Sequence, residues 1–118
     1  MTNKRYKNLA FSLCLSIIIS ACSYQQLSAE FPNENEVKVN EKFRITLPED
    51  HSTGYVWQIK PIHQNEVLHY KGSVYRGSVK GVDFNFEALH VGKDTLQFSL
   101  IKYKDTIDTK KFVIEVKP

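Results

Sequence analysis

The chain has 118 residues, 42% of them hydrophobic and 25% charged, with two cysteines and a formal net charge of +3. The three surplus cations are Lys4, Arg5 and Lys7, so residues 22–118 hold equal numbers of basic and acidic side chains. This balance argues against nucleic-acid binding, which requires a basic surface on the folded part. The length beyond the first 21 residues suits one domain with one hydrophobic core.

Residues 1–21 have the pattern of a removable signal peptide. The basic residues Lys4, Arg5 and Lys7 precede an uncharged, mostly apolar run, Leu9–Ala21. This run has the length of the hydrophobic region of a signal peptide and is shorter than the roughly 20 residues that span a bilayer. We therefore expect residues 1–21 to be cleaved.

The end of this run resembles a bacterial lipobox, because Ile19, Ser20 and Ala21 directly precede Cys22. In that motif the cysteine receives a diacylglycerol and becomes the first residue of the mature protein. The resemblance implies a lipid on Cys22 that holds the protein to a membrane, with residues 22–35 as a polar tether. The alternative is an ordinary secretory peptide that is cut near Ala21 or Ala29, with Cys22 incidental.

The lipobox also implies a location and a redox state. The protein is expected in a bacterial cell envelope, and Ser23 after the cysteine favours the outer membrane if the cell has two membranes. Cys14 lies in the signal peptide and leaves with it, so the mature chain has no pair of cysteines. We expect the domain to fold as a monomer without a disulfide.

From residue 36 onward, apolar side chains recur at every second position, which is the period of a half-buried β-strand. This pattern marks six regular segments, and a seventh, less regular strand is expected in Val67–Tyr75, with a turn at Lys71–Ser73. Residues 36–118 therefore predict an all-β domain, an immunoglobulin-like antiparallel sandwich of about seven strands, with a small barrel as the alternative. The six regular segments are Val37–Val39, Phe43–Leu47, Tyr55–Ile59, Phe84–Ala88, Leu96–Leu100 and Phe112–Val116.

Candidate catalytic and metal-binding groups give weak signals. Asp50, His51 and Ser52 are the residue types of a hydrolase triad, but adjacent residues cannot form a relay that is built from distant segments. The four histidines lack the spacing of zinc ligands. The Gly77–Gly81 loop lies between strands, so it does not form a phosphate loop, which opens a helix. We expect no catalytic residues, no metal and no cofactor, and hence no enzyme.

The segment Ser52-Thr53-Gly54-Tyr55-Val56-Trp57 resembles the Asn-Pro-Thr-Thr-Gly-Tyr-x-Trp motif of the chagasin-type inhibitors of papain-like cysteine proteases. The similarity continues through the Gly77–Gly81 loop, Phe84–Ala88, Gly92–Leu96 and the final strand. In that family, three loops at one end of an immunoglobulin-like sandwich enter the protease cleft, and the Thr-Thr-Gly loop covers the catalytic cysteine. The resemblance implies that the protease-binding residues are Ser52, Thr53, Gly54, Tyr55, Gly77, Gly81, Lys102 and Tyr103.

The flanking loops depart from the family pattern. The family's Gly-x-Gly-Gly loop is reduced to Gly77 and Gly81, and its Arg-Pro-Trp loop corresponds to Lys102-Tyr103-Lys104. The central loop has Asp50-His51 in place of Asn-Pro. We therefore consider two functions: a reversible tight-binding inhibitor of papain-like cysteine proteases, and an envelope-anchored, immunoglobulin-like interaction module without protease inhibition.

Overall fold

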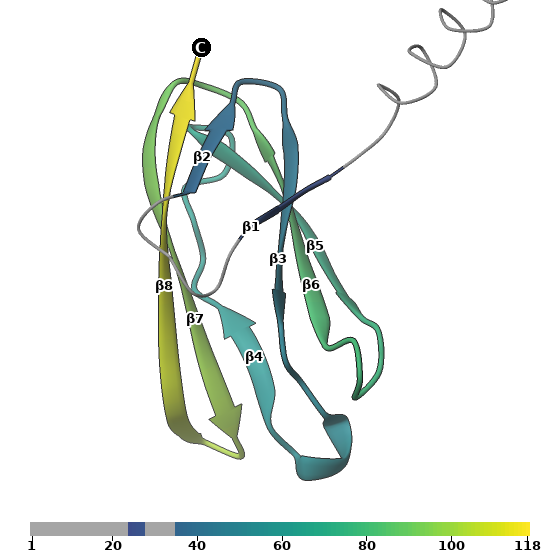
Figure 1. The fold of residues 1–118 in the computed structure, drawn as a ribbon. Helices are drawn as coiled ribbons and strands as arrows, with labels where there is room; N and C mark the ends of the chain where they lie inside the picture. Colours follow the sequence, from purple (N-terminus) through teal and green to yellow (C-terminus); the bar gives the residue numbers. More distant parts are fainter. Residues whose placement is uncertain (1–23, 28–34) are drawn as a thin grey trace, which may run out of the picture.

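The computed structural model describes residues 24–27 and 35–118, so the predicted signal peptide and Cys22 lie outside the described residues. The described residues form eight strands and one short 3₁₀ helix (Figure 1). The elements are β1 (Gln25–Leu27), β2 (Asn35–Lys38), β3 (Lys42–Leu47), η1 (His51–Thr53), β4 (Val56–Ile59), β5 (Leu68–Tyr75), β6 (Val82–Ala88), β7 (Gly92–Lys102) and β8 (Asp105–Lys117).

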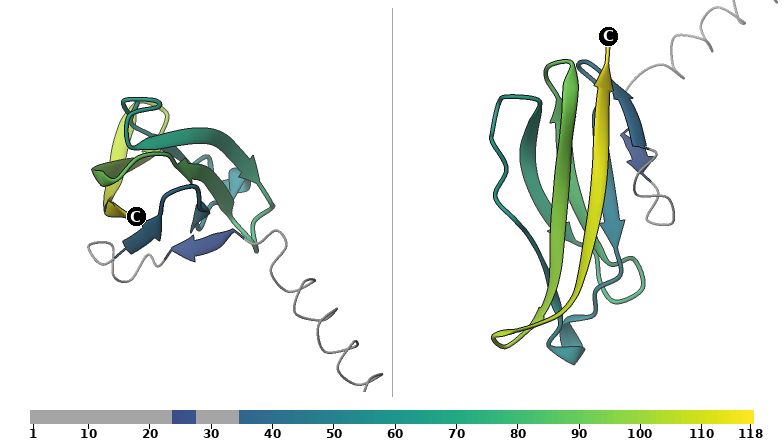
Figure 2. Two further views of the ribbon diagram at one scale, coloured as in Figure 1. Left: turned by 90° about the horizontal axis from the view of Figure 1, so that it is seen from above. Right: turned by 90° about the vertical axis from the view of Figure 1, so that its left-hand side faces the viewer.

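The strands form two four-stranded sheets, with the orders β1-β3-β6-β5 and β2-β8-β7-β4. The two sheets pack face to face (Figure 2), which confirms the predicted sandwich over the barrel. Four of the six strand pairs are antiparallel, as predicted, and two are parallel: β1 pairs parallel with β3, and β2 pairs parallel with β8. Parallel neighbouring strands need a crossover connection. Between β1 and β3, the chain crosses to the opposite sheet, where it forms β2, and then returns.

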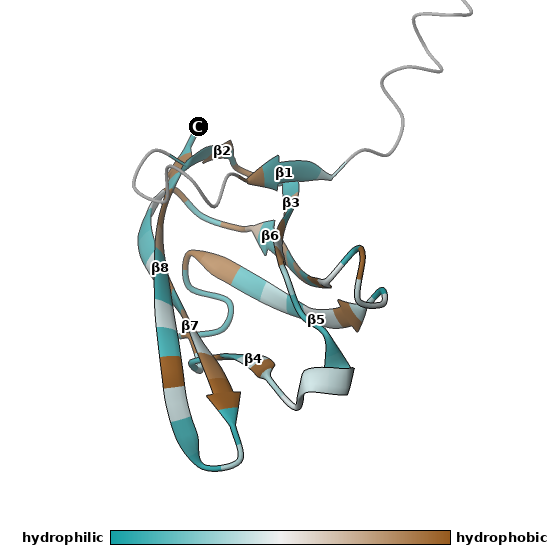
Figure 3. Cartoon of the chain, turned by 60° about the horizontal axis from the view of Figure 1, so that its bottom comes forward, coloured by the Kyte–Doolittle hydropathy of each residue, from teal (hydrophilic) through white to brown (hydrophobic). Residues whose placement is uncertain are grey.

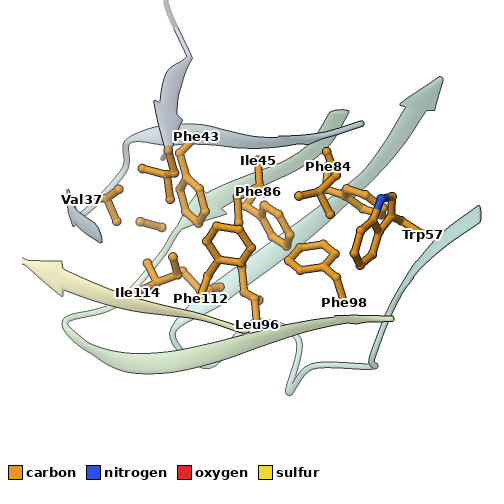
Figure 4. Packing of buried hydrophobic residues seen from close by; sticks show 14 of the residues in the cluster. Val37, Phe43, Ile45, Trp57, Phe84, Phe86, Leu96, Phe98, Phe112 and Ile114 are labelled. Atoms are coloured by element: carbon orange, nitrogen blue, oxygen red, sulfur yellow. The ribbon is translucent and has the colours of Figure 1, made fainter. Parts of the chain in front are cut away.

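The core lies between the sheets and is rich in phenylalanine (Figure 4). Phe98 of β7 packs its ring edge-on against Phe84 of the facing sheet, with ring centroids 4.8 Å apart, and against Phe112 of β8 at 5.6 Å. Each such side chain contributes about 1.5–3 kcal/mol when buried. The buried hydrophobic residues are Leu27, Val37, Phe43, Ile45, Leu47, Trp57, Leu68, Val82, Phe84, Phe86, Ala88, Leu96, Phe98, Phe112, Ile114 and Val116.

The segment predicted to turn at Lys71–Ser73 continues instead as one strand, β5. Its pairing with β6 shifts by one residue between Tyr70 and Gly72, so Lys71 is the extra residue of a β-bulge. A bulge bends a strand without reversing it, and glycine accommodates the unusual backbone, here with a φ of 117° at Gly72. The turn prediction was therefore wrong, although the glycine does mark an irregularity.

Part of the predicted tether is a strand. Gln25–Leu27 form β1, which pairs with Phe43–Ile45 of β3 and buries the side chain of Leu27 in the core. The Gln26 amide also donates a 3.0 Å hydrogen bond to the hydroxyl of Thr46. These residues therefore extend the first sheet. Within the described part of the chain, no helix has the length and apolar character needed to cross a membrane.

Candidate functional site

Three connections lie together at one end of the sandwich, which we call the loop end. They are the central loop (Asp50–Gly54), the glycine loop between β5 and β6 (Arg76–Gly81) and the hairpin turn between β7 and β8 (Tyr103–Lys104). In Figure 1 and in the right-hand view of Figure 2, the central loop lies between the other two, and the C-terminus lies at the opposite end. The sequence-predicted residues on these three connections are therefore brought together.

The central loop is a single turn of 3₁₀ helix whose first end is capped by Asp50. The Asp50 carboxylate accepts hydrogen bonds from the Ser52 backbone N–H at 3.0 Å and from the Ser52 hydroxyl at 2.7 Å. The Thr53 hydroxyl points back and donates to the Asp50 carbonyl at 2.6 Å. The Ser52 and Thr53 hydroxyls are thus both hydrogen-bonded to Asp50, while residues 51–54 stay exposed to solvent.

The other end of the turn depends on Gly54, which has a φ of 81° and a ψ of 1°. This left-handed conformation is unfavourable for residues with a Cβ. It lets the Gly54 N–H reach the carbonyl of His51 at 3.3 Å and close the turn.

The two hydrogen bonds from Ser52, first that of its hydroxyl and then that of its backbone N–H, lower the pKa of Asp50 below its usual value near 3.8. The cap is therefore a carboxylate across the neutral and mildly acidic range. An ionised acceptor at this position makes stronger hydrogen bonds than a neutral one.

Beneath the central loop lies a buried carboxylate that the sequence analysis did not select. Glu49 accepts a hydrogen bond from the Trp57 backbone N–H at 2.6 Å and contacts His51 Nε2 at 2.8 Å. The indole N–H of Trp57 in turn donates to the Pro48 carbonyl at 2.8 Å. The strand that enters the loop and the strand that leaves it are therefore tied together at its base.

His51 connects the central loop to β5. Its ring stacks on Tyr75, with centroids 3.5 Å apart and planes 11° from parallel, and its backbone N–H donates to the Tyr75 hydroxyl at 3.3 Å. Asp50 and Ser52 bond to each other, while His51 bonds to Glu49. The three residue types of the apparent triad therefore form no relay, as the sequence analysis predicted.

The glycine loop is closed by its own backbone. The Arg76 N–H donates to the Gly81 carbonyl and the Gly81 N–H to the Gly77 carbonyl, both at 2.8 Å. A Cβ at Gly81 would overlap the carbonyl of Leu47, so this position packs the loop against β3. At the tip of the loop, Val79 is 97% exposed.

Asp83, the second residue of β6, holds the base of the glycine loop. Although it lies on the outer face of its sheet, Asp83 is only 3% exposed, because it pairs with Arg76 and Arg44 and accepts a 2.7 Å hydrogen bond from Thr46. Arg44 also lies 4.9 Å from the ring centroid of Tyr24, the residue before β1. The network therefore connects the glycine loop to the N-terminal strand.

Lys102, the last residue of β7 before the hairpin turn, holds its ammonium 4.7 Å from the ring centroid of Tyr55, the residue that follows the central loop. A cation over an aromatic face is attracted by the ring's electron density. Tyr55 begins one of the alternating segments that predict a buried strand face, but it is half-buried beneath Lys102 and absent from the core cluster. The next residue, Tyr103, has a φ of 58° and is 90% exposed, so its ring projects from the turn.

All eight predicted protease-binding residues are therefore found at or next to the loop end, and their role in binding stays a prediction. Glu49 and Tyr75, which support them, were missed. A single sequence holds no signal for the partners of a glutamate in a turn or a tyrosine at a strand end. Across residues 24–27 and 35–118, no cluster of three His, Cys, Asp or Glu side chains is placed to hold a metal.

The hydropathy of the loop end is uneven (Figure 3). The end of β7 is hydrophobic, the hairpin turn is mostly hydrophilic, and η1 is intermediate in hydropathy. Two apolar or aromatic tips, Val79 and Tyr103, stand out into solvent on loops that flank the polar central loop. This arrangement resembles the mixed composition of protein interfaces more than that of a small-molecule pocket.

Comparisons with known proteins agree with this architecture. The family model "Chagasin family peptidase inhibitor I42" matches residues 36–116. The structure is similar to the crystal structure of the cysteine protease inhibitor EhICP2 from Entamoeba histolytica, with a TM-score of 0.65, 15% sequence identity, and coverage of 80% of this chain and 95% of that chain. At that identity, the likeness supports the fold. No curated protein matches the sequence.

Proposed function

The chain belongs to the chagasin family of peptidase inhibitors, and we propose that it is a reversible, tight-binding inhibitor of papain-like cysteine proteases that inserts Ser52–Gly54 over the protease's catalytic cysteine. Membership in an inhibitor family confirms the prediction that the protein is not an enzyme. The observation that supports the loop mechanism best is the exposed Ser52–Gly54 turn, closed on itself and standing between two other loops.

The chemistry of the turn suits a wedge that must approach a catalytic cysteine closely. Ser52, Thr53 and Gly54 have small side chains, and the Ser52 and Thr53 hydroxyls are bonded back to Asp50. The turn therefore presents backbone and small side chains in one shape. Because this shape exists before binding, little conformational entropy is lost when the complex forms.

The flanking loops would supply the edges of the interface. Tyr103 offers a large, exposed aromatic side chain in the two-residue turn between β7 and β8. Aromatic residues of this kind often dominate binding energy. Lys102, held over Tyr55, would act as a charge at the rim. Gly77 and Gly81 would shape the loop on the other side.

A substitution at the centre of the turn tests this mechanism. Thr53→Arg places a long cation where a close backbone approach is required, so inhibition of papain by soluble residues 23–118 should fall by at least about 100-fold. Thr95→Arg is the matched control, because Thr95 is also exposed but lies near the start of β7, away from the loop end. Inhibition that survives Thr53→Arg in a folded sample would exclude the central wedge.

We further propose that Cys22 carries lipid and anchors the protein in a bacterial envelope membrane. Support comes from the lipobox-like residues and the preceding basic and apolar regions. Expression of the full chain in a bacterium with radiolabelled palmitate should label the protein and place it in the membrane fraction. Cys22→Ser should remove the label and release the protein; a labelled or membrane-bound Cys22→Ser variant would contradict the assignment.

A further inference from the structure

Glu49 is an unusually placed acid, because its side chain is only 2% exposed although it directly precedes an exposed loop. Both of its oxygens are occupied: one accepts from the Trp57 N–H at 2.6 Å and the other contacts His51 Nε2 at 2.8 Å. A buried carboxylate is stable only when such partners are present. The position of His51 is therefore set by a group that cannot itself reach a bound protein.

His51 is held from a second side by Tyr75, through ring stacking and through its backbone N–H. Tyr75 ends β5, and the glycine loop begins at the next residue. Half of the His51 side chain remains exposed, at 51%. His51 thus forms part of the central loop and contacts both the buried carboxylate below it and the strand that leads to the glycine loop.

From this geometry we propose that Glu49 and His51 are positioning residues, which hold the central loop in its binding shape and fix its position relative to the glycine loop. This inference rests on the proposed inhibitory function and deepens it. Glu49 is too buried to contact a protease, so its effect must pass through His51 and the backbone of the turn. The sequence pattern gave neither residue a role.

The proposal predicts a particular kinetic effect. If only a fraction of the free inhibitor holds the binding shape, the apparent dissociation constant rises by the reciprocal of that fraction. Association then slows, while the complex, once formed, dissociates as before. Loss of a direct contact has the opposite signature, because contact residues act mainly on the dissociation rate.

Rate constants for papain binding by residues 23–118, which contain every described residue, separate the two cases. For His51→Ala we expect association about tenfold slower and dissociation changed by less than about twofold. His51→Gln should recover most of the association rate, because its amide N–H can donate to Glu49. His69→Ala is the matched control: its imidazole bonds Asn65 at 3.0 Å, outside the three loops, and neither rate should change.

Three results would overturn the proposal: unchanged rates for His51→Ala, faster dissociation alone, or failure of His51→Gln to recover the association rate. Glu49→Gln provides a second series, because a carboxamide can still accept from the Trp57 N–H and can donate to the ring of His51. It should stay within about threefold of the wild-type association rate. A tenfold slower association of Glu49→Gln with an unchanged melting temperature would show that Glu49 and His51 do not position the loop as described.

A measurement on the free protein keeps this inference separate from the inhibitory function. In ¹⁵N relaxation experiments, the amides of Ser52 and Thr53 should be rigid in the wild type and His51→Gln, and mobile on the picosecond-to-nanosecond timescale in His51→Ala. If the wild type inhibits no papain-like protease, the proposed function fails, but relaxation still decides whether the pair orders the loop. Equal rigidity in all three proteins would refute the positioning role.

Discussion

At the scale of single residues, the central loop is defined by short-range interactions at its two ends. Asp50 caps the first turn through Ser52, and Gly54 closes the last turn in the left-handed conformation. Neither interaction depends on the rest of the domain, so local sequence alone favours a turn here. What local sequence does not determine is the direction in which the turn projects, and this depends on Glu49, His51 and Tyr75 beneath it.

The Asp50 cap gives the loop a predictable response to acid. Hydrogen bonds lower the pKa of Asp50 in the folded protein, so the cap stabilises the loop fully above the unfolded value and loses this effect as pH falls through the folded value. We expect the Ser52 amide resonance to show a transition below about pH 4 that reports protonation of the cap. In Asp50→Asn the low-pH shift should be absent. A low-pH shift of the same size in Asp50→Asn would contradict this assignment.

At the scale of elements, each loop of the site is the end of a strand that the core holds in place. Alternating apolar residues predicted six of the strands, because a strand with one buried face needs nothing more than that pattern. The bulge in β5 escaped prediction, since Gly72 marks a turn and a bulge equally well. The N-terminal strand β1 also escaped, because three residues are too few to establish a period of two.

The residues of the candidate site likewise fall into those that could be predicted from the sequence and those that could not. Its exposed residues were found through the family resemblance: the motif in the central loop gave the match, and the family's flanking loops implied Gly77, Lys102 and Tyr103. Glu49 and Tyr75 were not found, because a buried glutamate and a stacking tyrosine are recognised only by partners that the fold brings to them. Tyr55 was misplaced for a related reason: alternation assigns it to the core, but Lys102 covers it at the edge instead.

Strand β1 leads to a prediction at this scale. Leu27 is 5% exposed and belongs to the core, although β1 lies outside residues 36–116 that match the family. Leu27→Ala should lower the free energy of unfolding by about 2–3 kcal/mol, as for other buried leucines. Urea denaturation of residues 23–118 measures it, with Gln25→Ala, whose side chain is exposed, as the control. A loss below about 0.5 kcal/mol would mean that β1 is not part of the cooperative unit.

At the scale of the whole molecule, the two ends of the sandwich differ. The loop end carries the central loop, the glycine loop and the hairpin turn, while the C-terminus lies at the opposite end (Figure 1). Strand β1 runs parallel to β3, which itself runs toward the loop end, so the chain enters the domain moving toward the site. Under the proposed lipidation, three residue steps separate Cys22 from Gln25, a reach of at most about 10 Å. The anchored domain would therefore be held close to the membrane surface.

The most direct test of the inhibitor account is a titration of papain, and of a cathepsin L-type protease, with residues 23–118 under reducing conditions. The account predicts competitive inhibition with a dissociation constant below about 1 μM, and none against a serine protease. A sample shown to be folded that leaves both cysteine proteases active at roughly 50 μM would contradict it. That result would favour an interaction module that keeps the sandwich without the inhibitory activity.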